Sequence, residues 1–311
     1  MLARFALDPD VLSSAGMGAH KRLMREWMRY GVLCCNAGSF ADSELAGILD
    51  ELPQSVRTLW KKILKNAWLK PAPNGWSGLH GLEDHPNEAS VLNGELELAC
   101  LEATRLELVR DELLNVCPSV ELGLFEDIDT SAAFVHSHEL AEKRTDGIKV
   151  SDLWNERFSL AASLVKNITV VDRFALADGE GINGLEAFLV LLDGAGRKVN
   201  VTVYSSFGDE WLRLSESDAQ SRVVAIRRRL ARGGVGDIQL FLSDSRTFGH
   251  VEHDRFLKFD HLVFEIGSGM AIFNGSQSKQ STFSSKVEQD GHKKTVTDLR
   301  RLCSSAYPVL V

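Results

Sequence analysis

Long apolar runs are missing from this sequence, and so are closely spaced cysteine pairs. No apolar run approaches the roughly 18 residues that a membrane-spanning helix needs. The opening segment MLARFALDPDVLSS soon becomes polar and acidic, so we expect neither a transmembrane segment nor a signal peptide. The five cysteines include no CxxC pair, which predicts reduced, structural thiols. These absences favour a cytoplasmic protein.

The remaining composition is that of a globular protein, with 44% hydrophobic and 25% charged residues in a chain of 311. This length suits one large or two modest domains, each able to bury a core. The formal charge of −8 is unevenly spread. Residues 1–150 hold 15 Lys and Arg against 23 Asp and Glu, whereas residues 151–311 hold 20 of each. The acidic first half argues against nonspecific adhesion of that half to nucleic acid.

Hydrophobic periodicity predicts an α/β fold with two domains, residues 1–148 and 149–311. The first domain opens with a strand that ends at an acidic turn and continues with amphipathic helices. In the second domain strands alternate with helices, which is typical of a mainly parallel sheet with helices on its faces. We expect the strands of the second domain at residues 167–174, 198–206, 237–243 and 261–266.

The strongest motif begins at His253 and runs HDRFLKFDHLVFEIGSG. Residues two apart on an extended segment point to the same side, so His253 and Arg255 would face one phosphate together. A neutral imidazole can attack phosphorus, and a guanidinium can bind phosphate oxygens bidentately. Asp260 would orient or polarise a histidine, and backbone amides near Gly267 and Ser268 would complete the anion site.

A plainer interpretation of the same residues stays open. His253 could be a solvated loop residue, and Asp254 could form a surface ion pair with Arg255. The Asp and Gly-Ser offsets that follow favour the phosphate-binding interpretation over this one.

The spacing resembles the pattern that defines the phospholipase D superfamily: His-x-Lys, four residues, Asp, six residues, Gly-Ser. Arg255 stands in place of lysine, and Ala271 in place of the usual asparagine. From about residue 154 to the end, the chain more closely resembles the C-terminal domain of eukaryotic MIT-domain-containing proteins, which has His-Asp-Arg at this point. That resemblance implies a phospholipase-D-like fold that binds phosphoinositides and membrane surfaces without catalysis.

Two departures limit what the resemblance implies. Phospholipase D enzymes use two such motifs, one histidine attacking and the other donating a proton, whereas this chain has one. The nearest second candidate, Asp172-Arg173-Phe174, has no histidine. Catalysis by His253 would therefore require a homodimer formed through the C-terminal domain. There is also no MIT helical bundle before the domain, so the eukaryotic partner-binding role does not transfer.

The opening FALDPDVL resembles the first strand of PIN-like nucleases, in which a hydrophobic strand ends in Asp. Such enzymes gather carboxylates around Mg²⁺ or Mn²⁺ to activate water. The resemblance makes Asp8 the first metal ligand, with Asp10 beside it in the catalytic site. Later carboxylates that spacing does not assign are available at Asp111, Glu112, Glu126, Asp127 and Asp129. We take Asp127 as the candidate later ligand and catalytic residue. As the alternative, Asp8 followed by proline is also typical of a turn or a helix cap.

Together these features favour a protein that acts on nucleic acid or a phosphorylated ligand. The leading hypothesis joins a PIN-like, metal-dependent nuclease to a phospholipase-D-like phosphate-binding module, a pairing that by analogy suits bacterial defence or stress systems. The second is a non-catalytic module that binds phosphoinositide, phosphate or nucleic acid. The third is a dimeric, single-motif phosphodiesterase that uses His253.

Overall fold

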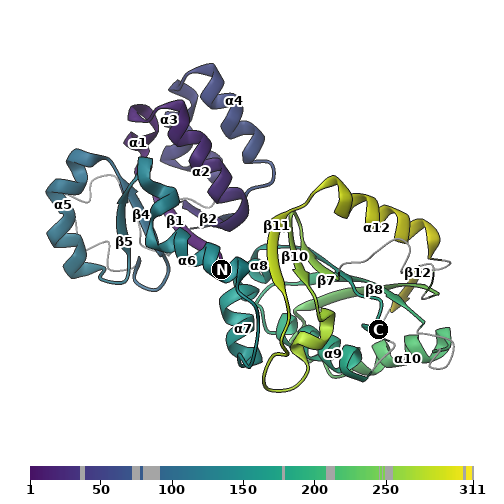
Figure 1. Ribbon diagram of the computed structural model, residues 1–311. Helices are drawn as coiled ribbons and strands as arrows, with labels where there is room; N and C mark the ends of the chain where they lie inside the picture. The colour runs from purple at the N-terminus through teal and green to yellow at the C-terminus, as the bar shows by residue number, and fades with distance from the viewer. Residues whose placement is uncertain are drawn as a thin grey trace. The chain divides into compact units, whose positions relative to one another are not determined.

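The computed structural model describes residues 1–35, 39–71, 78–79, 92–176, 179–207, 214–244, 246, 248, 255–303 and 306–309. The chain divides into two compact units, Met1–Glu139 and Leu140–Val311. Each unit has its own β-sheet with helices beside it (Figure 1). The α/β class expected from the sequence is therefore confirmed, whereas the PIN-like and phospholipase-D-like identities remain predictions.

The first unit is built on a five-stranded parallel sheet with the order β3-β2-β1-β4-β5. Its strands are β1 (Ala3–Leu7), β2 (Gly31–Cys35), β3 (Leu69–Pro71), β4 (Leu98–Leu101) and β5 (Glu121–Leu124). Its helices are α1 (Pro9–Ser14), α2 (Met17–Tyr30), α3 (Glu44–Glu51), α4 (Gln54–Ile63), α5 (Ala103–Val116), the 3₁₀ turns η1 (Phe40–Asp42) and η3 (Phe125–Thr130), and α6 (Ala132–Glu142), in which the division between the units falls.

Helices cover both faces of this sheet. On one face Ala6 and Ala99 pack with Val109 and Leu113 of α5. On the other face Phe5 contacts aromatic rings of α2 and α6, among them Trp27 at a centroid distance of 6.0 Å. Successive side chains of a strand point to opposite faces of the sheet. The small residues therefore lie on the face covered by α5, and the large aromatic rings lie on the other face.

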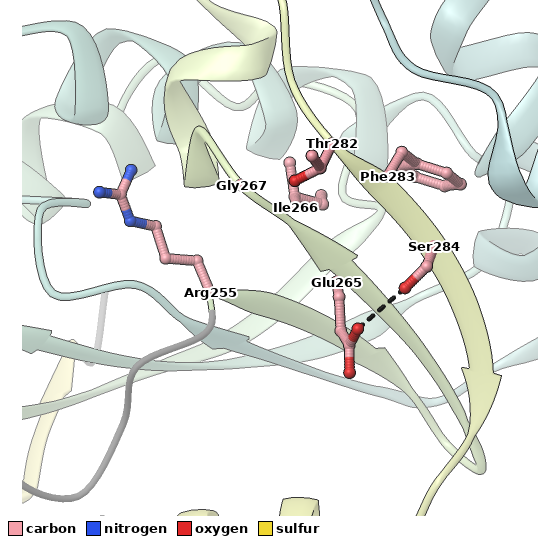
Figure 2. Close-up of a pocket in the computed structure, with 7 residues that line it drawn as sticks. All are labelled: Arg255, Glu265, Ile266, Gly267, Thr282, Phe283 and Ser284. Carbon is pink, nitrogen blue, oxygen red and sulfur yellow. Dashed lines mark hydrogen bonds between the residues drawn. The ribbon is translucent and has the colours of Figure 1, made fainter.

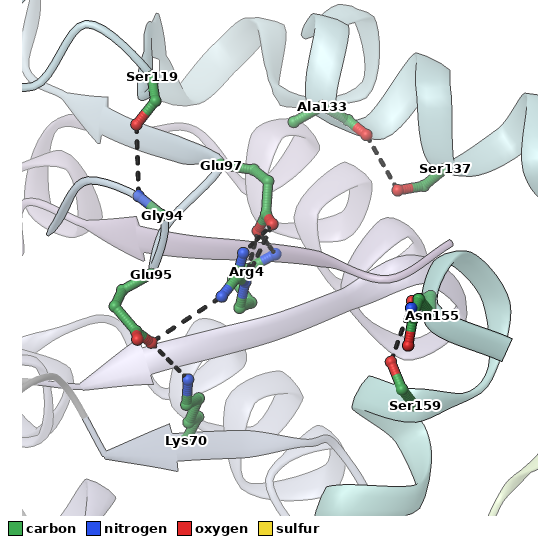
Figure 3. Close-up of polar contacts among 10 residues, drawn as sticks. All are labelled: Arg4, Lys70, Gly94, Glu95, Glu97, Ser119, Ala133, Ser137, Asn155 and Ser159. Carbon is green, nitrogen blue, oxygen red and sulfur yellow. Dashed lines mark hydrogen bonds and ion pairs between the residues drawn. The ribbon is translucent and has the colours of Figure 1, made fainter. Parts of the chain in front are cut away.

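Ion pairs link β1 and β3 to the segment that precedes β4 (Figure 3). The Arg4 side chain pairs with Glu97, and its backbone N–H donates to the same carboxylate at 2.6 Å. The ammonium of Lys70 lies 2.8 Å from Glu95, which also faces Arg4 at 3.9 Å. With Lys70 beside it, the pKa of Glu95 lies below its ordinary value.

The second unit is built on a seven-stranded sheet with the order β11-β10-β9-β6-β7-β8-β12. Its strands are β6 (Asn167–Val171), β7 (Val199–Ser206), β8 (Val235–Ser243), β9 (Phe256–Phe259), β10 (Leu262–Ile266), β11 (Phe283–Val287) and β12 (Ala306–Val309). Its helices are α7 (Val150–Arg157), α8 (Ser159–Leu164), α9 (Gly179–Asp193), α10 (Glu216–Arg227), the 3₁₀ turn η4 (Gly269–Phe273) and α12 (Asp290–Leu302).

This second sheet is mixed, so the expectation of a mainly parallel sheet is wrong. Only β6, β7 and β8 pair in parallel, whereas β9, β10, β11 and β12 join antiparallel. The physical reason is the short connection between β9 and β10, because parallel neighbours need a long crossover. Strand direction therefore reverses between β6 and β9, in the middle of the sheet.

Each face of the mixed sheet has its own buried cluster. Leu299 of α12 packs with Phe241, Phe256 and other side chains of one face. On the opposite face Phe158 lies at the centre of an aromatic group, with ring centroids of Phe264 5.1 Å and Phe273 5.4 Å away. The five cysteines of the two units are all buried and form no disulfide. Within the described ranges, no helix is both long and apolar enough to cross a membrane.

Candidate anion-binding site

Three strand ends meet where the second sheet changes direction. Asp172 follows β6, and Arg255 precedes β9, which runs antiparallel to β6. Their side chains are therefore neighbours, with Arg255 Nε 3.8 Å from Asp172 Oδ1. Because β10 returns antiparallel beside β9, the N–H of Ile266 donates to the carbonyl of Arg255 at 2.8 Å. This pairing brings Gly267 and Ser268 next to Arg255.

The Asp172 carboxylate is buried and held by the backbone. It accepts hydrogen bonds from the N–H of Phe174 at 2.9 Å and of Met270 at 2.7 Å, and its side chain is 3% exposed. A buried carboxylate needs such partners because its desolvation is costly. Asp172 thus joins the turn after β6 to η4 and gives the guanidinium of Arg255 a fixed neighbour.

Gly269 is required for this arrangement. Its φ of 59° lies in the left-handed region, and a Cβ there would lie 2.1 Å from Asp172 Oδ2 and 2.6 Å from Arg255 Cδ. Any side chain would displace both charged groups. Two glycines of α9 play a similar part, since a Cβ at Gly184 would lie 1.9 Å from the Met270 carbonyl and one at Gly181 2.1 Å from the Phe174 carbonyl.

The Arg255 guanidinium is half-buried and points toward open space. It lies 4.8 Å from the centroid of the Phe174 ring, which Arg173 also contacts at 4.4 Å. Figure 2 shows the guanidinium extending away from Glu265. Among the residues that the structure describes, no acceptor lies within hydrogen-bonding distance of its two terminal nitrogens. These nitrogens can therefore bind an external acceptor.

Two cavities border Arg255. One, of about 250 Å³, is lined by Asp172, Phe174, Glu180, Gly181, Arg255, Ser268, Ala271 and Lys279. The other, of about 220 Å³, is drawn in Figure 2 and lined by Arg255, Glu265, Ile266, Gly267, Thr282, Phe283 and Ser284.

The charges of the two cavities differ. In the 220 Å³ cavity burial opposes ionisation of Glu265, but hydrogen bonds from Lys286, Ser284 and His292 hold its pKa below the ordinary value. The 220 Å³ cavity thus holds one cation, Arg255, and one carboxylate. The 250 Å³ cavity holds two cations, Arg255 beside Asp172 and Lys279 paired with Glu180, so it offers an anion one more cationic donor. The hydroxyl oxygen of Ser268 is buried without a partner among the described residues. The 250 Å³ cavity is thus the better suited to an anion.

The structure separates some of the residues that the motif grouped. His253 lies outside the described residues. Asp260 occupies the tight turn between β9 and β10 with a φ of 49°. It lies at the opposite end of β9 from Arg255, roughly 16 Å away at about 3.3 Å per residue. The expectation that Asp260 takes part in the same anion site is therefore wrong.

The backbone amides of Gly267 and Ser268 are already used. The N–H of Gly267 donates to the carbonyl of Thr282 at 3.1 Å, and the N–H of Ser268 donates to the hydroxyl of Ser281 at 2.9 Å. These two N–H groups are therefore not free for an anion, while the expected roles of Gly267 and Ser268 in phosphate binding remain predictions. Ser268 borders the 250 Å³ cavity, and Gly267 borders the other one.

Sequence reasoning missed three residues of the site. Asp172 was considered only as part of a second motif that lacks a histidine, and neither Gly269 nor Lys279 was singled out. Asp172 carried a usable signal, because an aspartate directly after a buried strand of an α/β sheet lies at a position where ligands commonly bind.

In the first unit, the expected metal ligand Asp8 lies at the carboxyl end of β1. The strand order reverses between β1 and β4, a location where open α/β sheets commonly bind ligands. Asp8 is fully buried and accepts from the N–H of Asp10 at 3.1 Å. Arg105 of α5 pairs with both carboxylates, its Nη1 2.7 Å from Asp8 and its Nη2 2.9 Å from Asp10. Burial raises the pKa of Asp8, opposed by the Asp10 N–H and by Arg105.

The other carboxylates do not complete a metal site with Asp8. Glu102 caps α5 and accepts from the N–H of Thr104 and Arg105 at 2.8 and 3.2 Å. Asp127 is exposed in η3. Within the described ranges, no three His, Cys, Asp or Glu side chains are arranged to hold a metal ion. The residues present therefore do not fit the expected Mg²⁺ or Mn²⁺.

Comparisons with known proteins leave this chain without a family. No protein-family model matches it, and no curated protein does. Among solved structures, it is matched to that of TrmBL2, an archaeal chromatin protein described as having a novel mode of DNA binding. That match has 12% sequence identity and a TM-score of 0.25, and it covers 91% of this chain and 76% of the other. So low a score supports no inference about fold or function.

Proposed function

We propose that the second unit binds a phosphate or phosphodiester group in the 250 Å³ cavity, with Arg255 as the main contact. The observation that carries this proposal is the place of Arg255, which lines the cavity and lies beside buried Asp172, with Nε as the nitrogen nearest to that carboxylate. A guanidinium fork presented in this way suits two oxygens of one phosphate. Lys279 and the unpaired hydroxyl of Ser268 add a second cation and a donor.

The same chemistry fits two sources of phosphate, a nucleic-acid strand or a phosphorylated lipid headgroup. The experiment therefore uses both with the full-length chain. The probes are labelled single-stranded RNA and DNA with and without a 5′-phosphate, and phosphatidylcholine vesicles with and without a phosphoinositide. All titrations contain EDTA, and binding is followed by fluorescence anisotropy or vesicle co-sedimentation.

We expect one probe to bind in a phosphate-dependent way and Arg255→Ala to weaken that binding roughly ten- to a hundredfold, as for loss of hydrogen bonds to a charged group. Arg255→Lys keeps the positive charge but loses the two-pronged guanidinium, so its affinity should lie between those of the wild type and Arg255→Ala. The matched control is Arg301→Ala, which removes an arginine that is 75% exposed on α12. Phosphate-dependent binding that is unchanged in Arg255→Ala, or no binding of any probe, would contradict the proposal.

Catalysis is the competing hypothesis, and the same probes test it. Cleavage that persists in EDTA and is lost in His253→Ala would indicate the dimeric phosphodiesterase. Cleavage that requires Mn²⁺ and is lost in Asp8→Asn would indicate the PIN-like nuclease. The ion pairs of Arg105 with Asp8 and Asp10 argue against the second outcome. A role in bacterial defence or stress rests on analogy alone.

A further inference from the structure

A cation of the protein itself lies between the two carboxylates that were expected to bind metal. The guanidinium of Arg105 places one terminal nitrogen on Asp8 and the other on Asp10, at 2.7 and 2.9 Å. We propose that Arg105 takes the place of a divalent cation at the carboxyl edge of the first sheet, so that this edge excludes Mg²⁺ and Mn²⁺. The proposal concerns the first unit and is independent of phosphate binding by the second.

Burial makes the pairing hard to displace. The Asp8 side chain has no exposed surface, and that of Arg105 is 13% exposed. A metal ion that bound Asp8 would have to separate this buried carboxylate from the guanidinium, and it would place a second cation beside a mostly buried Arg105. Breaking a buried ion pair in this way is strongly unfavourable.

The remaining oxygens are also occupied. Asp8 Oδ1 accepts from the N–H of Asp10, and the Glu102 carboxylate accepts from two amides at the start of α5. Mg²⁺ demands nearly octahedral oxygen ligands at short distances. At this edge the place between the carboxylates is filled by nitrogen donors, and the third carboxylate caps a helix.

Arg105 lies at the edge of the first sheet where a ligand would be expected to bind. Where the strand order reverses, the loops after β1 and β4 diverge and leave space for a ligand. Arg105 closes this space from the first turns of α5, bridging the loop after β1 to the helix after β4. With the space closed, Asp8 and Asp10 hold α1 and α5 together.

The test measures Mn²⁺ binding to the full-length chain by electron paramagnetic resonance of the free ion, which needs no activity. We expect the wild-type protein to show no Mn²⁺ binding that depends on Asp8. Arg105→Met keeps the length of the side chain and removes the charge. It should gain one Mn²⁺ per chain, at least tenfold tighter than any binding to the wild type, and the further change Asp8→Asn should remove it.

The matched control is Arg110→Met, which removes an exposed arginine from the same helix and should behave as the wild type. Asp8-dependent Mn²⁺ binding by the wild type would overturn the proposal, and so would an Arg105→Met protein that folds by circular dichroism but gains no Mn²⁺. If Arg105→Met fails to fold, Arg105→Lys provides the second test. It keeps one cation at the site and should still exclude Mn²⁺, and Mn²⁺ binding by that variant would refute the idea.

Discussion

At the scale of residues, each unit pairs a buried aspartate with an arginine, and the two pairs differ in one respect. Asp8 follows β1 and Asp172 follows β6, each directly after a buried strand. Both terminal nitrogens of Arg105 form ion pairs with carboxylates, whereas Arg255 lies beside its aspartate through Nε at 3.8 Å. The same two side-chain types thus form a closed ion pair in the first unit and, in the second, the looser pair that we propose as an anion site.

Gly269 offers the most direct test of the open site. In Gly269→Ala the new Cβ would collide with Asp172 and Arg255, so we expect phosphate binding to fall at least tenfold. The left-handed backbone adds a stability cost of about 1–2 kcal/mol. Phosphate-probe titrations and urea unfolding measure the two effects separately.

Gly275→Ala is the control for backbone strain. Gly275 also has a positive φ, of 90°, but a Cβ there would meet nothing within 4 Å. The variant should lose stability of the same order and bind phosphate as the wild type does. Equal binding losses in the two variants would mean that the collision with Asp172 has no bearing on the site.

At the scale of elements, the sequence predicted four strands of the second sheet, β6, β7, β8 and β10, and did not predict β9, β11 or β12. β6, β7, β8 and β10 were expected close to where they lie, because each is a β-rich run bounded by turn residues. β9 was treated as part of a motif, although FLKF and LVFEI are separated by only Asp260 and His261. A two-residue connection of this kind predicts an antiparallel hairpin with a residue of positive φ, which Asp260 supplies.

The β9–β10 hairpin explains which residues of the motif lie together in the structure. Arg255 and the Gly-Ser pair lie at the two open ends of β9 and β10, so pairing brings them together, whereas Asp260 at the turn is carried away. The contribution of Asp172 and Lys279 could not be predicted, because their approach depends on strand order and on the position of η4. Neither is encoded in local spacing.

The turn between α10 and β8 is held by one carboxylate, that of Asp193 at the end of α9. Asp193 accepts from the N–H of Arg232 at 2.6 Å, of Gly234 at 2.8 Å and of Val235 at 3.2 Å. Although burial opposes its ionisation, these hydrogen bonds hold the pKa of Asp193 below the ordinary value. We expect Asp193→Ala to destabilise the second unit by roughly 1–3 kcal/mol near neutral pH, measured by urea unfolding.

The pH dependence follows from the direction of that shift. Because the folded-state pKa is lowered, the stabilisation is complete above the unfolded pKa of about 3.9 and is lost as the pH falls through the folded value. The difference between wild type and variant should thus stay constant from neutral pH to about 4.5 and shrink in stronger acid. Asp237→Ala, which removes an exposed carboxylate of β8, is the control and should change little. A difference that grew toward acid would contradict this account.

At the scale of the whole molecule, the first half of the chain is more acidic than the second. Residues 1–150 carry 15 cationic and 23 anionic side chains, and residues 151–311 carry 20 of each. Neither set favours the counterion release that drives nonspecific binding to nucleic acid. The cavity that we propose for phosphate holds only the cations Arg255 and Lys279, which suits one phosphate group better than a long polyanion.

This charge distribution predicts weak binding to random duplex DNA. At 0.15 M salt we expect a dissociation constant no tighter than about 10⁻⁴ M, the weak end of nonspecific binding. Fluorescence anisotropy of a labelled random duplex at several salt concentrations measures it. Micromolar affinity that falls steeply with salt and is unaffected by Arg255→Ala would mean that another surface binds DNA.

The reversal of strand direction between β6 and β9 has one more consequence. It places a residue that leaves one strand beside a residue that enters the next, and both are fixed by the hydrogen-bonded centre of the sheet. Loops elsewhere in the second unit can then lengthen or shorten without separating Asp172 from Arg255. Protein engineers could therefore vary the chain around Lys279 to select among phosphorylated ligands while the guanidinium stays in its place.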